Sequence, residues 1–211
     1  MNTQILVSFI FATATLAFSP GPDNVFVLVQ TISFGKRKGM AIVVGLILGC
    51  IIHTSIVAFG LSSFIQSSQK LLFLLKLIGA FYLLYLAYIT YTSKHEIDIK
   101  KQSGNSTSLF RLFKRGFVMN VINPKVSLFF MVFFPAFLFS PTLSLTTQFF
   151  ILGLLFMGTS FLVFTLIVFC SGSVASILRK NKRFEVIIKW FQIVVFVIIS
   201  VFILITKQSI V

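Results

Sequence analysis

Long uncharged stretches constrain this sequence more than any other feature. A helix needs about 20 apolar residues to cross the roughly 30 Å hydrocarbon core of a bilayer. We therefore expect an all-α integral membrane protein with six transmembrane helices. The six segments that meet this requirement are residues 5–32, 40–64, 71–91, 117–139, 145–174 and 186–206.

The composition excludes a single soluble globular fold. Hydrophobic residues make up 57% of the chain and charged residues only 10%, whereas soluble domains average about 25% charged residues. In a soluble protein the formal net charge of +14 would suggest nucleic acid as a partner. Here the basic residues fall in short clusters between apolar segments, a pattern that indicates loops at the surface of a lipid bilayer and no nucleic-acid partner.

The basic clusters also predict the orientation of the chain. They lie at residues 36–38, 94–115 and 179–183, after the first, third and fifth segments. The loops and tails on the other side carry only Lys70 and Lys207. By the positive-inside rule the clusters face the cytoplasm, so both termini are predicted to lie outside.

The spans divide into two halves. We expect a single transport domain over residues 1–211, with a first three-helix repeat at 1–92, a cytoplasmic linker at 93–113 and a second three-helix repeat at 114–211. Because three spans return the chain on the opposite side of the membrane, the second repeat is inverted relative to the first.

The first segment is interrupted by Ser19-Pro20-Gly21-Pro22-Asp23-Asn24. Prolines remove N–H donors and disfavour helix in the preceding residue, and glycine frees the backbone further. The freed backbone groups are tolerated in hydrocarbon only when they are buried in protein or line a polar cavity. We therefore predict a binding site that contains Pro20, Gly21, Pro22, Asp23 and Asn24.

The fourth segment has a matching interruption at Asn123-Pro124-Lys125, with Asn120 just before it. Interruptions in corresponding positions of two halves are the best sequence indication of a transporter binding site. Asn120, Asn123, Pro124 and Lys125 therefore join the predicted site.

This site suits a zwitterion, because a broken helix offers carbonyls at one end and N–H groups at the other. Asp23 is the only acidic residue within a span and is predicted to bind and release a proton, although it can instead cap the following helix. Lys125 can bind a substrate carboxylate, neutralise Asp23 or extend to the membrane surface. His53 is a candidate proton relay or a hydrogen-bonded packing histidine.

Other classes of function find little support. The spans hold one Asp, one His and scattered Ser and Thr, which is too few groups for an enzyme's nucleophile and base. Cys50 and Cys170 stand alone, so we expect no metal site and no cofactor. An efflux carrier for another small solute or a metal cation is the alternative, although cation sites usually gather several oxygen or sulfur ligands.

Four motifs appear in the order 19–23, 35–39 followed by Gly45 and Gly49, 76–86, and 115–125 followed by 134–137. Together they resemble the lysine exporter (LysE/RhtB) family of bacterial amino-acid efflux proteins over nearly the whole chain.

The resemblance implies a multi-pass carrier in the bacterial cytoplasmic (inner) membrane that exports small neutral amino acids such as threonine, homoserine or leucine. It also implies proton antiport and a homodimer. Many relatives have an acidic residue in the fifth span, but residues 145–174 contain none, so more of any coupling role rests on Asp23.

Overall fold

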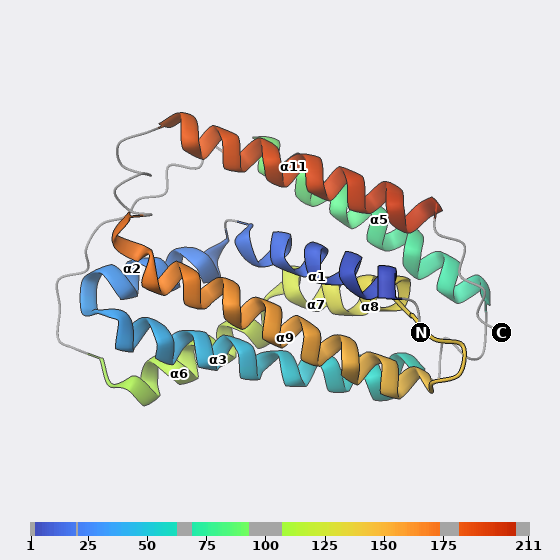
Figure 1. Cartoon of the computed structure of the whole chain (residues 1–211), viewed down its shortest axis with the longest axis horizontal. Helices are drawn as coiled ribbons and strands as arrows, with labels where there is room; N and C mark the ends of the chain where they lie inside the picture. The colour runs from blue at the N-terminus through green and yellow to red at the C-terminus, as the bar shows by residue number, and fades with distance from the viewer. Residues whose placement is uncertain (1–2, 20, 63–68, 93–106, 174–181, 206–211) are drawn as a thin grey trace.

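The computed structural model describes residues 3–19, 21–62, 69–92, 107–173 and 182–205, and every regular element in these ranges is a helix (Figure 1). The elements are α1 (Thr3–Phe18), α2 (Pro22–Phe34), α3 (Lys36–Ser55), η1 (Ile56–Leu61), α5 (Gln69–Thr92), α6 (Leu109–Val121), α7 (Pro124–Leu128), η2 (Phe129–Phe133), α8 (Phe134–Ala136), α9 (Leu145–Phe169) and α11 (Lys182–Ile205). The π-helical turn η1 continues α3, and the π-helical turn η2 joins α7 to α8.

Within the described ranges, two continuous helices are long and apolar enough to cross a membrane: Lys36–Leu61, formed by α3 and η1, and α9. Two bent pairs raise this number to four if each pair is one span. α1 and α2 meet at 60°, and α6 meets the α7–α8 segment at 48°. α5 and α11 contain the shorter apolar stretches Leu77–Thr92 and Lys189–Val201. The predicted all-helical membrane fold is therefore supported with two to four candidate spans.

One boundary differs from the sequence-based expectation. α6 begins at Leu109, inside the predicted 93–113 linker and well before the predicted 117–139 segment. The Ser108 hydroxyl accepts a hydrogen bond from the Arg111 backbone N–H at 3.4 Å and so caps the helix. Basic residues in the first turns lower the local hydropathy, which is why the apolar count placed this helix too late.

The two halves run in opposite directions through the bundle. α1 and α2 run toward one end, and α6, α7 and α8 run back toward the other (Figure 1). α3, α6 and α11 all begin at the same end, so the basic residues at 36–38 and 111–115 lie together there (Figure 1). The predicted cluster at 179–183 is only partly described, and residues 93–106 and Lys207 lie outside the described ranges.

α3 and α6 come from different halves and pack closely against each other. A Cβ added at Gly45 of α3 would overlap the Phe113 backbone of α6, and one added at Gly116 of α6 would overlap the Ile42 carbonyl of α3. Small residues let membrane helices approach in this way. The contact fixes the end of α6, and with it the second break, against α3.

We expect Gly45→Ala to separate α3 from α6, because its methyl group meets backbone atoms that cannot rotate away. Overpacking of this kind costs roughly 1–3 kcal/mol. The melting temperature of the detergent-purified protein should therefore fall by about 2–12 °C. Gly158→Ala in α9 is the matched control, because nothing lies within 4 Å of the added methyl group. Equal melting temperatures for the two variants would contradict the close α3–α6 contact.

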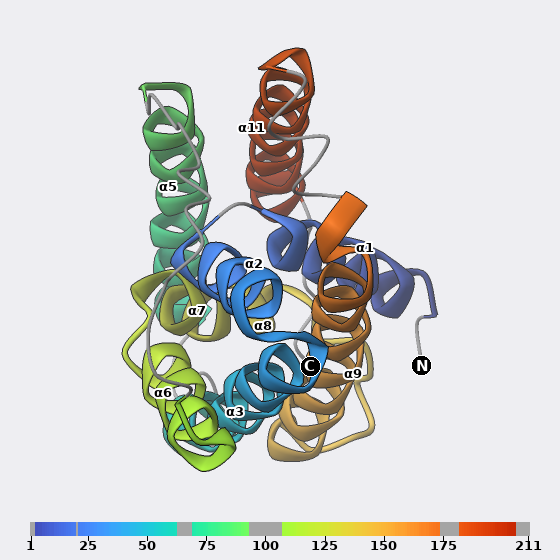
Figure 2. The same ribbon diagram turned by 90° about the vertical axis from the view of Figure 1, so that its left-hand side faces the viewer.

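α5 and α11 form a pair that extends away from the other helices (Figure 2). The Lys189 Nζ donates to the Tyr91 carbonyl at 2.6 Å, and the Tyr91 and Trp190 rings meet edge to face at 6.0 Å. Farther along, the Ser200 hydroxyl donates to the Ala80 carbonyl at 3.0 Å. The outer faces of both helices expose large apolar side chains, as surfaces in contact with lipid do.

A cluster of buried phenylalanines fills the bundle between the second break and the end at which α1 begins. Phe130 packs against Phe134 with ring centroids 4.2 Å apart and against Phe156 at 4.8 Å. Phe9 of α1 meets Phe134 edge to face at 5.3 Å. These rings, at most 4% exposed, form an apolar barrier between α1, η2 and α9.

Candidate functional site

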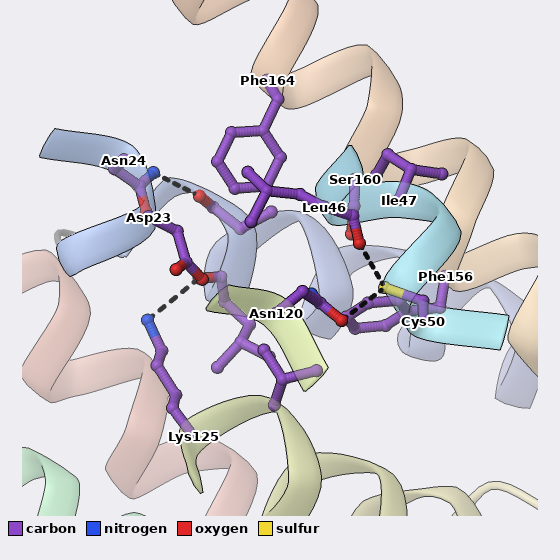
Figure 3. A pocket seen from close by; sticks show the side chains of 13 residues that line it. Asp23, Asn24, Leu46, Ile47, Cys50, Asn120, Lys125, Phe156, Ser160 and Phe164 are labelled. Atoms are coloured by element: carbon purple, nitrogen blue, oxygen red, sulfur yellow. Dashed lines mark hydrogen bonds between the residues drawn. The ribbon is translucent and has the colours of Figure 1, made fainter. Parts of the chain in front are cut away.

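The first predicted break separates α1, which ends at Phe18, from α2, which begins at Pro22. Gly21 is the N-cap of α2 and has an extended backbone (φ −161°) that any residue can adopt. The Asn24 side-chain Nδ2 reaches back and donates to the Ala17 carbonyl at 2.7 Å (Figure 3). One carbonyl freed at the end of α1 is therefore satisfied by the chain itself.

Lys125, which belongs to the second break, satisfies two more of these carbonyls. Its Nζ donates to the Leu16 carbonyl at 3.3 Å, to the Ser19 carbonyl at 3.2 Å and to the Ser19 hydroxyl at 2.7 Å. An ammonium group has three N–H donors, so these three oxygens use all of them. In this state Lys125 ties the two broken helices together, and a substrate carboxylate would have to compete with those oxygens.

Asp23 lies in the first turn of α2 and is only 8% exposed. The Asn123 Nδ2, from the other half, donates to the Asp23 Oδ2 at 2.6 Å. The other oxygen, Oδ1, is buried without a hydrogen-bond partner among the described residues. Leaving a buried acceptor unpaired is costly, and more so when it carries charge. This oxygen is therefore a position at which a proton or a cationic group would be stabilised.

The second break is a helix restart with its own cap. α7 begins at Pro124, and the Asn123 Oδ1 accepts from the Lys125 backbone N–H at 3.0 Å. The Asn120 carbonyl, near the end of α6, accepts from the Asn123 N–H at 3.0 Å and contacts the His53 Nε2 at 3.1 Å. Because a carbonyl can only accept, the His53 Nε2 must carry the hydrogen.

α3 holds the Asn120 side chain from the opposite side. The Cys50 thiol donates to the Asn120 Oδ1 at 3.7 Å (Figure 3) and lies 3.5 Å from the Leu46 carbonyl. A Cβ at Gly49 would overlap the Asn120 side chain. The glycine therefore makes room for the amide that Cys50 positions.

A cavity of about 420 Å³, its open mouth included, lies between the two breaks (Figure 3). Only water-sized molecules fit its enclosed part, so an amino acid requires the surrounding helices to move apart. The polar lining comes from Asp23, Asn24, Cys50, Asn120, Lys125 and Ser160, and the apolar lining includes Leu46, Ile47, Phe156 and Phe164.

The structure brings the polar members of the predicted site together. Asp23, Asn24, Asn120 and Lys125 line one cavity, although they come from different halves of the chain. Asn123 does not line it but holds the Asp23 carboxylate through the 2.6 Å hydrogen bond. The two breaks therefore lie beside each other in the structure.

The remaining predicted residues shape or flank this cavity. Gly21, Pro22 and Pro124 set where α2 and α7 begin. Pro20 lies outside the described residues. His53 lies behind the end of α6, outside the cavity lining, where its ring also packs against Phe130 with centroids 5.4 Å apart.

Sequence reasoning missed the contribution of α9. Phe156, Ser160 and Phe164 recur every four residues and so share one helix face, which borders the cavity. Ser160 is buried, and no hydrogen bond joins its hydroxyl to the described residues. The sequence signal was a serine within a uniformly apolar helix, which is weak because serine is common in such helices.

The model of the family described as "LysE type translocator" matches residues 14–207. The chain belongs to the LysE type translocator family. This agrees with the resemblance seen in the sequence motifs.

Several curated proteins align with most of this chain. The homoserine/homoserine lactone efflux protein of Salmonella typhimurium is 28% identical over 90% of this chain and 92% of its own length. The leucine efflux protein of Enterobacter sp. is 26% identical over 83% of both chains. An uncharacterized membrane protein of Vibrio cholerae is 25% identical over 73% of this chain and 74% of its own. No solved structure matches significantly.

Proposed function

We propose that this translocator exports amino acids from the cytoplasm through the cavity between its two helix breaks. The observation that carries the proposal is the unpartnered Asp23 Oδ1, which is buried beside a cavity that both halves of the chain build. Intramembrane carboxylates are expensive and mark transport sites. Two LysE-type relatives are named for the efflux of leucine and of homoserine and its lactone.

The substrate's amino group binds the Asp23 Oδ1, where it gains a charge-assisted hydrogen bond. The substrate's carboxylate lies against Asn120 and Ser160, whose amide and hydroxyl groups can donate. Lys125 supports the site by holding the end of α1 and supplies positive charge nearby. Leu46, Ile47 and Phe164 provide an apolar wall, which favours neutral over charged side chains.

Export is driven by proton antiport in this proposal. The Asp23 Oδ1 binds the substrate ammonium on the cytoplasmic side and a proton on the outer side, so the two cargoes exclude each other. Each ligand shifts the equilibrium between the inward-open and outward-open states only as far as it binds one of them more tightly than the other. His53 acts here by holding the Asn120 carbonyl rather than as a relay, because a carbonyl does not pass a proton onward.

We also propose the membrane arrangement expected from the sequence. Six spans form two inverted three-helix repeats in the bacterial inner membrane, with both termini outside and the basic clusters in the cytoplasm. The opposite directions of α1–α2 and α6–α8, and the common end of the basic residues (Figure 1), support this arrangement. The homodimer implied by the family resemblance is part of the same proposal.

Efflux of a metal cation is the competing function. Among the described residues, no three His, Cys, Asp or Glu side chains lie close enough to hold a metal ion together. The cavity offers a single carboxylate beside the Lys125 ammonium. A divalent cation usually needs several oxygen ligands, so this lining favours an organic ammonium over a metal.

The test is counterflow in proteoliposomes that contain the purified protein, preloaded with each of the twenty amino acids in turn under an imposed pH step. We expect the uptake of a labelled small neutral amino acid to depend on the matching internal amino acid and on the pH step. Counterflow of none of the twenty, together with export of a divalent metal salt, would contradict the proposal.

A further inference from the structure

A second cavity lies directly behind the first. It measures about 250 Å³, its opening included, and lies among α1, α5, α7 and η2. Leu16 and Lys125 line both cavities. These two residues therefore form the wall that separates them.

The second cavity is almost entirely apolar. Besides Lys125 and Tyr82, its lining consists of glycine, aliphatic and phenylalanine residues, among them Leu83, Leu86 and Val132. Its enclosed part, like that of the first cavity, admits only water-sized molecules. A polar ligand would find few partners here, whereas an apolar group would only displace weakly held water.

Of the two wall residues, Lys125 is held in place by hydrogen bonds, whereas the Leu16 side chain can be changed without breaking them. The Lys125 ammonium is held by one oxygen of Leu16 and two of Ser19, which follows the end of α1, so its side chain cannot leave without breaking those hydrogen bonds. Leu16 is 6% exposed, and only its backbone carbonyl takes part in those bonds. Its side chain can therefore be shortened while the bonds of Lys125 persist.

We infer that the second cavity is a subsite for the apolar side chain of the substrate and that Leu16 sets the largest side chain admitted. The inference rests on the proposed function, because it requires the amino group to bind at Asp23 in the first cavity. A substrate bound there directs its side chain either to the mouth or toward Leu16. One methylene more or fewer on a substrate in a hydrophobic pocket changes its discrimination by roughly 10–200-fold, so the space beside Leu16 should decide which side chains are accepted.

Leu16→Ala tests the inference by joining the two cavities. In proteoliposome counterflow, we expect the ratio of phenylalanine to leucine transport to rise at least about tenfold over the wild type. Leucine counterflow should persist, because Asp23 and Lys125 are unchanged. The added space should also accept tryptophan more readily, because its indole is the bulkiest apolar side chain.

Two further variants test whether the change in selectivity comes from opening the second cavity or only from enlarging the first. Leu46→Ala removes the same atoms from the lining of the first cavity, but Leu46 does not border the second. Leu83→Phe fills the second cavity, because Leu83 is buried and lines it. We expect no comparable rise in the ratio of phenylalanine to leucine transport for Leu46→Ala. In the Leu16→Ala/Leu83→Phe double variant, the rise caused by Leu16→Ala should be reversed.

Equal phenylalanine gains in the two Leu→Ala variants, or a gain that survives Leu83→Phe, would overturn the subsite. A Leu16→Ala protein that still exchanges leucine but transports phenylalanine no better than the wild type would also overturn the subsite. The proposed function would then still stand. Failure of the wild type to exchange any amino acid would instead refute the proposed function.

Discussion

Asp23→Asn is expected to abolish proton-driven amino-acid exchange while leaving the protein folded and inserted. The amide still accepts the hydrogen bond from Asn123, so the two breaks stay joined. It cannot bind a proton at neutral pH, and it offers no charge to a substrate ammonium. Hydrogen bonds to charged groups contribute about 1.5–3 kcal/mol, so leucine affinity should fall by roughly 10–150-fold, and accumulation driven by a pH step should disappear.

The measurement is labelled-leucine uptake into proteoliposomes with and without a pH step, at matched protein incorporation. Glu185→Gln makes the same charge change near the start of α11 and should keep wild-type coupling. If Asp23→Asn retained full proton coupling, Asp23 would have no part in the mechanism, and the proposed antiport would need another group.

Lys125→Met is expected to cause the second large loss, chiefly through stability. The variant removes the charged donor from the Leu16 carbonyl, the Ser19 carbonyl and the Ser19 hydroxyl. It also removes a positive charge that acts on the buried Asp23. Hydrogen bonds to charged groups contribute about 1.5–3 kcal/mol each, so the melting temperature should fall by roughly 10 °C, and transport should drop with it.

A double variant separates the effect of the lost Lys125 hydrogen bonds from the effect of its lost charge. If the charge of Lys125 offsets that of Asp23, adding Asp23→Asn to Lys125→Met should restore part of the lost stability, which is non-additive coupling. Lys189→Met is the matched control, because the Lys189 ammonium donates to the Tyr91 carbonyl at an exposed position, away from the two breaks. A wild-type melting temperature for Lys125→Met would show that the bonds to α1 do not hold the breaks together.

The location of the site could be predicted from local rules. Proline removes a backbone donor wherever it stands, so Pro22 and Pro124 marked the helix restarts before any tertiary contact was known. The charge of Asp23 and Lys125 inside apolar segments carried the same local signal. The structure places Asp23 and Lys125, which the sequence separates by about a hundred residues, in the lining of one cavity.

The detailed roles could not be predicted, because they depend on tertiary contacts. Nothing near Lys125 in the sequence indicates that its ammonium reaches Ser19, more than a hundred residues earlier. Ser160 resembles any serine in an apolar helix until α9 packs beside α3. The start of α6 at Leu109 was hidden because its basic residues make an amphipathic helix look like a linker.

In the proposed mechanism, a substrate amino group binds the Asp23 carboxylate between two broken helices. The decisive measurement is an experimental structure of the protein saturated with the amino acid that exchanges fastest in the counterflow screen. We expect ligand density between α1–α2 and α6–α7, with the substrate nitrogen within about 3.2 Å of the Asp23 Oδ1. Density elsewhere, or continuous helices through residues 19–22 and 122–124, would contradict it.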